Sequence, residues 1–481
     1  MNFRFIINIF GRVLILLSIL MATNLVWAFV YCEDTVWRHI FAIITTLLAG
    51  FGMFLFTRAG ISRVLSIKDS YFTVTFVWVV MSIFGGLPYF FTGSIEHIPD
   101  IIFEAFSGFT TTGSSILIDI EALPKSILYW RSLTHWLGGM GIIVLVVAIF
   151  PLLRIGGYNL LKSETSSISG EKLAPKTAVM AKSLWAIYVV MTFVQVGLLM
   201  LGDISFFDAL NHAFSAIATG GFSTKNNSIT NFSPYVQYVL MLFMFLSGIN
   251  YFLHYHLING KFRRVFKNTE LRVYTSIVFL SGVIIALIIG VEKDMPLEKA
   301  FRESFFQVIS VVTTTGLFTV DYLEWSSQAW ILLFLLTFVG GCVGSTGGGV
   351  KVIRHVVSIK SVMIHFRKML HPNSVQLLKI NNEIIDDDKV SSLISFLVLY
   401  LLTIIAGTIA MVFLGEDLLT AVGAVSANMG GVGIGIGTVG PAGNYAHIHD
   451  AGKILLSFLM LIGRLEMTTV LILFTRIFWK E

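Results

Sequence analysis

Residues 100–113 read DIIFEAFSGFTTTG, and three later segments share their pattern. Each segment begins with an acidic residue and ends thirteen positions later on a glycine. The other three are DALNHAFSAIATGG from Asp208, ESFFQVISVVTTTG from Glu303 and DLLTAVGAVSANMG from Asp417. The spacing aligns Gly113, Gly221, Gly316 and Gly430, although NMGGVGIGIG offers several glycines in the fourth segment. In the first three segments a serine lies seven residues after the acid, and in the fourth segment Ala424 takes this place.

A segment of this kind is typical of a helix that crosses half a membrane and then continues as a loop. An acid at the start satisfies free N–H groups and the positive end of the helix dipole. Ten or eleven helical residues span roughly 15 Å, about half the hydrocarbon core. Irregular backbone at that depth must be buried or line an aqueous path. Four such loops around one axis can replace the hydration shell of a cation with carbonyl oxygens.

The surrounding chain is apolar enough to hold these segments in a bilayer. It has 481 residues, of which 56% are hydrophobic and 13% are charged, whereas a soluble domain carries roughly 25% charged residues. Ten stretches are long enough to span, at 5–31, 39–57, 71–92, 127–153, 183–201, 235–253, 273–291, 329–350, 391–414 and 452–479. We therefore expect an all-α integral membrane protein with four repeats of outer helix, pore helix and inner helix around a central pore, plus two extra N-terminal transmembrane helices.

The repeats predict the division of the chain into domains. The two extra helices occupy 1–57, and the run at 5–31 is too long for a signal peptide. The four repeats then occupy 58–153, 154–253, 254–350 and 391–481. A cytoplasmic linker at 351–390 separates the last two repeats.

Charged residues predict the orientation in the membrane. With the N-terminus in the cytoplasm, most of the 33 Lys and Arg residues fall in cytoplasmic segments, as the positive-inside rule requires. Both termini are then cytoplasmic, and the basic residues need no nucleic-acid partner to explain them. The two cysteines lie far apart and exclude a disulfide framework or a CxxC metal site.

Several motifs resemble the potassium-translocating subunits of the Trk/Ktr/HKT superfamily, in its TrkH branch. They are FSGFTTTGSSIL at 106–117, HWLGGMGIIV at 135–144, FSAIATGGFST at 214–224, TTTGLFTVD at 313–321, FVGGCVGSTGGGVKVIR at 338–354 and MLIGRLEMTTVLILFT at 460–475. The resemblance covers the whole chain. It implies a potassium filter at Thr110, Thr111, Thr112, Gly113, Ala218, Thr219, Gly220, Gly221, Thr313, Thr314, Thr315, Gly316, Asn428, Met429 and Gly430. It implies a gate at Gly344, Ser345, Thr346, Gly347, Gly348, Gly349 and Arg464.

The same resemblance implies how the protein works and with what. Potassium is the transported substrate, and Gly113 resembles the first filter residue of the potassium-selective members. The chain itself is expected to bind no cofactor. The implied partners are a second copy, giving a homodimer, and a TrkA-like cytosolic ring that binds the nucleotide. The implied location is the bacterial cytoplasmic (inner) membrane.

Other interpretations of the same residues stay open at this stage. GSTGGGVK at 344–351 lacks the contiguous Gly-Lys-[Ser/Thr] of a phosphate loop, so we interpret the glycines of 340–349 as a helix break; close packing of small residues is the alternative. Arg464 is interpreted as facing the pore, with a structural ion pair as the alternative. A secondary transporter with alternating access is the second functional hypothesis. No nucleophile–base pair indicates an enzyme.

Overall fold

The computed structural model describes residues 1–57, 66–152, 177–374, 376–381, 383–465 and 467–480. The predicted starts of the first and second repeats, at 58–65 and 154–176, lie outside this range. The described residues are mostly helical, as expected, and six helices are long and apolar enough to cross a membrane. The number rises to eight if each of two bent helix pairs is one span.

The helices follow one another along the chain with short connections. Their bounds are α1 Phe3–Met21, α2 Asn24–Val30, α3 Val36–Phe56, α4 Ile67–Gly85, α5 Leu87–Thr92, α6 Ile98–Phe109, α7 Lys125–Leu152, α9 Thr177–Met200, α10 Phe206–Ile217, α11 Pro234–Ser247, α12 Tyr251–Ile258, α13 Phe262–Phe266, α14 Thr269–Glu292, α15 Leu297–Val312, α16 Ser327–Leu336, α17 Val352–Leu370, α18 Asp387–Phe413, α19 Leu418–Gly430, α20 Asp450–Arg464, α21 Met467–Leu471 and α22 Arg476–Trp479. Three short 3-10 turns are η1 Tyr322–Glu324, η2 Gly437–Val439 and η3 Ile472–Phe474. Two strands, β1 Lys379–Ile380 and β2 Glu383–Ile384, pair antiparallel and are a small addition to the expected all-α fold.

Four helices contain the repeated segments, and we refer to these four as the short helices. They are α6, α10, α15 and α19, which have 12, 12, 16 and 13 residues. Asp100 and Asp208 each lie in the first turn of their helix. Asp417 instead precedes α19 as its N-cap and accepts a hydrogen bond from Thr420. Glu303 lies in the middle of α15, because that helix begins earlier with Glu298 in its first turn.

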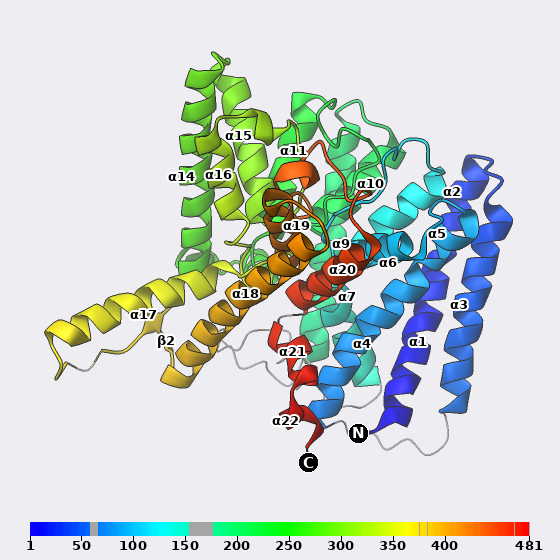
Figure 1. The fold of residues 1–481 in the computed structure, drawn as a ribbon, viewed down its shortest axis with the longest axis horizontal. Helices are drawn as coiled ribbons and strands as arrows, with labels where there is room; N and C mark the ends of the chain where they lie inside the picture. Colours follow the sequence, from blue (N-terminus) through cyan, green and yellow to red (C-terminus); the bar gives the residue numbers. More distant parts are fainter. Residues whose placement is uncertain (58–65, 153–176, 375, 382, 466, 481) are drawn as a thin grey trace.

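The short helices are packed between the longer ones, on the side of the molecule away from both chain ends (Figure 1). Helix α7 packs on α10, α11 packs on α15, and α20 packs on α6. The last of these contacts joins the C-terminal part of the chain to the first short helix. The described helices therefore form a closed arrangement rather than an open row.

Three long apolar stretches are broken helices rather than continuous spans. Helices α11 and α12 are bent by 98° at a break after Ser247. Helices α20 and α21 are bent by 116° at a break after Arg464. The stretch 329–350 is helical only to Leu336, and residues 340–350 are irregular up to α17. A helix break at 340–349 is thus present, as the glycines predict.

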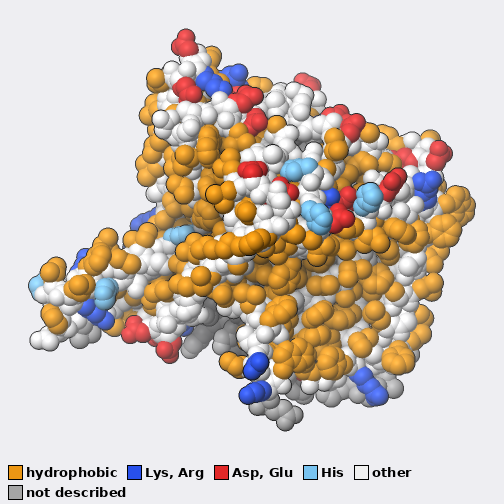
Figure 2. All heavy atoms as spheres, in the orientation of Figure 1, with side chains coloured by type: hydrophobic (Ala, Val, Ile, Leu, Met, Phe, Trp, Pro, Cys, Tyr) orange, Lys and Arg blue, Asp and Glu red, His pale blue; other side chains and the backbone are white. Residues whose placement is uncertain are grey.

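The first helices form a pair at the edge of the molecule (Figure 1). Helices α1 and α3 pack along their length, and they cross at Gly11 and Gly50. A Cβ added at Gly11 would lie 2.7 Å from the carbonyl oxygen of Gly50. Two small residues therefore allow the helix backbones to touch. The outer face of α3 is covered by exposed hydrophobic side chains, which contribute to the apolar surface seen in Figure 2.

Candidate ion pathway

Each short helix ends in the same backbone turn. The second residue after the helix has a left-handed conformation in the first three loops, with φ of 53° at Thr111, 54° at Thr219 and 60° at Thr314. A non-glycine residue adopts such values rarely. Three threonines in one unusual conformation show that the loops are held by their surroundings in a common shape.

One hydrogen bond recurs in all four loops and fixes their alignment. The main-chain N–H of Thr112 donates to the carbonyl of Ser107, five residues earlier. Gly220 donates in the same way to Ser215, and Thr315 to Ser310. In the fourth loop the equivalent bond joins Val432 to Ala427, at 2.9 Å. The residue that follows is Gly113, Gly221, Gly316 or Gly433, with φ of 86°, 89°, 79° and 80°.

The counterpart of Gly113 in the fourth loop is therefore Gly433, three residues after the Gly430 that the spacing selects. Gly430 is the last residue of α19 and is the counterpart of Thr110. Asn428 and Met429 lie inside that helix and not in the loop. The shift arises at the start of the helix, because Asp417 takes the N-cap place that Ser205 has in α10, three residues before Asp208.

The four loops contact one another in a closed ring. A Cβ added at Gly113 would overlap the carbonyl oxygen of Gly220 in the second loop. A Cβ added at Gly221 would likewise overlap the carbonyl oxygen of Thr315 in the third loop. A Cβ added at Gly316 would overlap the carbonyl oxygen of Val432 in the fourth loop. Gly433 meets Thr112 and returns the ring to the first loop. Only glycine fits these four places, because a side chain would meet a backbone oxygen at a positive φ.

The irregular segment 340–351 lies against the inner ends of the short helices. The N–H of Gly348 donates to Oγ1 of Thr314 at 2.6 Å, and Oγ1 of Thr346 donates to the carbonyl of Ile217 at 3.0 Å. A Cβ at Gly348 would lie 2.7 Å from the carbonyl oxygen of Gly430. The segment thus touches the ends of α10 and α19 and the loop after α15.

Arg464 ends α20 and reaches the same segment. Its Nη1 donates to the carbonyl of Thr346 at 2.7 Å. Its Nη2 donates to the carbonyls of Gly138 and Gly139 in α7, at 2.5 and 3.0 Å. Arg464 is therefore hydrogen-bonded to main-chain carbonyls of two other elements, rather than held only by a structural ion pair.

Glu270 in α14 connects the segment to the first turn of α17. Its Oε1 accepts a hydrogen bond from the N–H of Val343 at 2.8 Å and from that of Ile353 at 3.3 Å. The side chain is buried. At the sequence level Glu270 looks like any first-turn acid after the N-cap Asn268, so nothing in the sequence distinguished it.

Known proteins resemble the chain over its whole length. A family model for TrkH, described as a cation transport protein, matches residues 36–480. The chain belongs to the TrkH family. The Trk system potassium uptake protein TrkH of Escherichia coli K12 is 35% identical over 100% of both chains. TrkG of the same organism is 32% identical over 99% of both.

A solved structure of the TrkH family has the same fold. The crystal structure of the potassium transporter TrkH from Vibrio parahaemolyticus matches with a TM-score of 0.89 and 32% identity, over 100% of both chains. Family membership and the apolar helices together show that the chain is an integral membrane protein. The structural match covers the N-terminal pair α1 and α3 as well as the four short helices.

Proposed function

We propose that the chain takes up potassium across the bacterial cytoplasmic membrane through a filter made of the four loops. The closed ring carries this proposal, because each loop places a carbonyl against the glycine of its neighbour. Backbone oxygens arranged around one axis are the groups that replace the hydration shell of a potassium ion. The names of the related proteins, which are potassium uptake proteins, support the same ion.

The filter in this proposal is one turn of each loop. It consists of Thr110, Thr111, Thr112, Gly113, Ala218, Thr219, Gly220, Gly221, Thr313, Thr314, Thr315 and Gly316, with Gly430, Gly431, Val432 and Gly433 from the fourth loop. Residues 58–153, 154–253, 254–350 and 391–481 are the four repeats that supply these loops. The short helices face the outside, and both termini lie in the cytoplasm with the basic linkers.

The gate in this proposal is the segment 344–349 together with Arg464. The segment is positioned to block the path by its bulk, since it lies against the inner ends of α10 and α19. A guanidinium beside the path repels a cation, and a low dielectric strengthens that repulsion. A cytosolic nucleotide-binding ring bound to a homodimer would open the gate by moving α17, which directly follows the segment.

Ion flux into proteoliposomes tests the filter. The purified protein should pass potassium and rubidium faster than sodium and lithium. Gly113→Ser should reduce the ratio of potassium to sodium flux, because the added side chain meets the carbonyl of Gly220 and displaces one quarter of the ring. An unchanged ratio in a folded Gly113→Ser protein would remove Gly113 from the filter.

A further inference from the structure

A fully buried ion pair lies behind the first two loops. Glu104 belongs to α6 and Arg131 to α7, and their side chains are 0% and 1% exposed. Nε of Arg131 donates to Oε1 of Glu104 at 2.8 Å. Taking two charges out of water is costly, and an apolar pair of the same size is often as stable. The pair therefore needs an explanation other than stability.

Glu104 holds the outer end of the first loop. Its Oε2 accepts a hydrogen bond from the N–H of Ile116 at 3.1 Å. Both carboxylate oxygens also accept from Oγ of Ser115, at 3.0 and 3.1 Å. Ser115 and Ile116 follow Gly113 by two and three residues, so the carboxylate fixes the chain directly after the ring.

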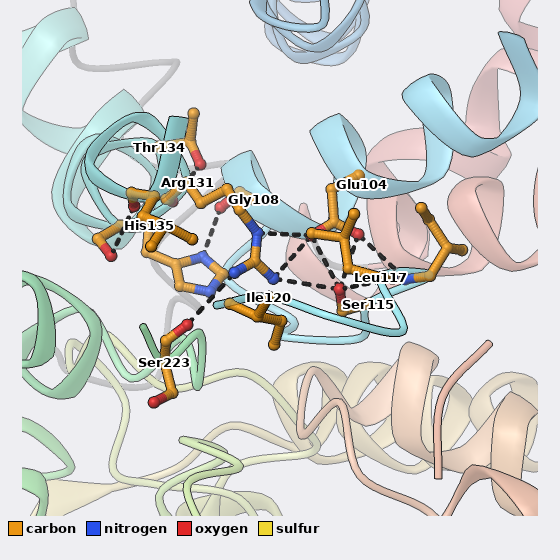
Figure 3. Close-up of polar contacts among 12 residues, drawn as sticks. Glu104, Gly108, Ser115, Leu117, Ile120, Arg131, Thr134, His135 and Ser223 are labelled. Carbon is orange, nitrogen blue, oxygen red and sulfur yellow. Dashed lines mark hydrogen bonds and ion pairs between the residues drawn. The ribbon is translucent and has the colours of Figure 1, made fainter. Parts of the chain in front are cut away.

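Arg131 extends the same contact to the second loop. Its Nη1 donates to the carbonyl of Ser223 at 3.3 Å, and its guanidinium lies 4.0 Å from the centre of the Phe222 ring. Its Nη2 donates to Oγ of Ser115 at 3.1 Å. Figure 3 shows the guanidinium between Glu104 and Ser115 on one side and Ser223 on the other. One side chain thus connects both loops beyond Gly113 and Gly221.

The connection continues to the fourth loop through Tyr445. The N–H of Tyr445 donates to the carbonyl of Ser115 at 2.9 Å. Its hydroxyl donates to the carbonyl of Gly433, also at 2.9 Å. The first loop is therefore fixed to the second by Arg131 and to the fourth by Tyr445, with Ser115 shared by both contacts.

We propose that Glu104 and Arg131 are positioning residues for ion selection, because together they set the distance between the first and second loops. The proposal rests on the proposed filter and adds to it two residues that lie outside the ring. The planar guanidinium presents several donors in a fixed fork, and charge-assisted hydrogen bonds are short and directional. Small displacements of Thr112 and Gly220 carbonyls change how well the ring fits potassium relative to sodium.

The test compares ion preference with total flux in proteoliposomes. Arg131→Lys keeps the positive charge but loses the fork, and Glu104→Gln/Arg131→Gln removes both charges at nearly constant volume. Each should lower the potassium-to-sodium flux ratio by about tenfold, the effect of losing one charge-assisted hydrogen bond. The potassium concentration that gives half-maximal flux should rise in parallel. Thermal unfolding identifies the variants that fold.

A second, less deeply buried ion pair provides the matched control. Lys453 of α20 lies 2.5 Å from Asp100 of α6, with side chains 5% and 17% exposed. Neither Lys453 nor Asp100 makes hydrogen bonds to the ring loops like those of Glu104 and Arg131. Asp100→Asn/Lys453→Gln should lower the unfolding temperature without changing the flux ratio. A ratio that falls equally in this control would mean that the effect is general destabilisation, and would overturn the proposal.

The remaining outcomes separate the pair from the filter itself. If Gly113→Ser lowers the ratio while folded Arg131→Lys and the double glutamine variant keep it, Glu104 and Arg131 have no positioning role and the filter stands. If Gly113→Ser also keeps the ratio, the proposed filter fails. Should the double variant not fold, Arg131→Lys decides the question alone, because it leaves the buried charge paired.

Discussion

Arg464 donates a hydrogen bond to the main-chain carbonyl of Thr346, with 2.7 Å between Nη1 and the oxygen. The bond joins the end of α20 to the middle of the glycine-rich segment, although the two residues are 118 positions apart. In the proposed gate, the bulk of the segment and the charge of the arginine are therefore parts of one barrier. Removing either part should open the same path.

Arg464→Ala should raise potassium flux in the absence of any partner protein, and so should deletion of residues 344–349. The lost bond to Thr346 is worth about 1.5–3 kcal/mol, so the increase should reach at least about tenfold. Rubidium uptake into proteoliposomes measures it. In Arg464→Ala the ratio of potassium to sodium flux should stay the same, since the hydrogen bonds of Arg464 go to Thr346, Gly138 and Gly139 and not to the ring. Arg263→Ala, in the exposed helix α13, is the matched control. Flux no faster than that of the parent in both variants would exclude the gate.

Glu270→Gln should also raise flux without a partner, but by less. The amide keeps the shape of the side chain and weakens the two hydrogen bonds to Val343 and Ile353, because a neutral acceptor binds less strongly than a carboxylate. A loss of about 1 kcal/mol predicts an increase of about fivefold. The exposed Glu292→Gln at the other end of α14 should have no effect. Equal flux in the two variants would show that Glu270 does not hold the segment.

Alanine at two neighbouring glycines distinguishes the two alignments of the fourth loop. Gly433→Ala should reduce flux by more than about tenfold, because the Cβ overlaps the carbonyl of Thr112 and the left-handed backbone costs about 1–2 kcal/mol. Gly430→Ala should be tolerated, since the nearest atom to its Cβ is 3.4 Å away and the residue is helical. Flux and unfolding temperature are measured for both. The reverse order of severity would restore Gly430 as the counterpart of Gly113.

The cytoplasmic ring should be recovered with the protein from its native membrane. The docking surface in this proposal is formed by the basic linkers at 154–182, 254–272 and 351–389, including the exposed basic end of α17. Residues 154–176 of the first linker lie outside the described residues. Reversal of charge at Arg367 and Lys368 should weaken capture of the ring and remove the response of flux to ATP and ADP. Reversal of charge at Lys293 is the control, because this residue lies at the C-terminal end of α14 and the 254–272 linker leads into the N-terminal end. If ATP and ADP leave the flux through the parent complex unchanged, the proposed regulation is contradicted.

Apolar length is a local property, but of ten predicted spans the described residues contain six sufficiently long helices, or eight if each bent pair is one span. Glycine content predicted the break at 340–349, whereas the breaks after Ser247 and Arg464 were not predicted. In the first three segments the aligned serines Ser107, Ser215 and Ser310 accept equivalent main-chain hydrogen bonds, so the predicted spacing agrees with the backbone there. In the fourth segment the spacing selects a different glycine, because it assumes that the acid has the same place in every helix. Asp417 is the N-cap of α19, whereas Asp100 and Asp208 lie in the first turn of their helices. Sequence reasoning missed the roles of Glu104, Arg131 and Glu270. These roles depend on contacts with residues that are distant in the sequence, and no local motif marks the three positions.

The closed ring of Gly113, Gly221, Gly316 and Gly433 comes from a single polypeptide. In a pore assembled from identical subunits, every substitution appears at all four positions at once. Here each quadrant has its own codons. The place held by Thr112 and Thr315 in the first and third loops is already taken by Gly220 in the second loop and Val432 in the fourth. In the proposed filter, evolution can therefore adjust one quarter of the ring while the other three quarters keep their fit to the ion. An engineer can make the same graded changes, one loop at a time.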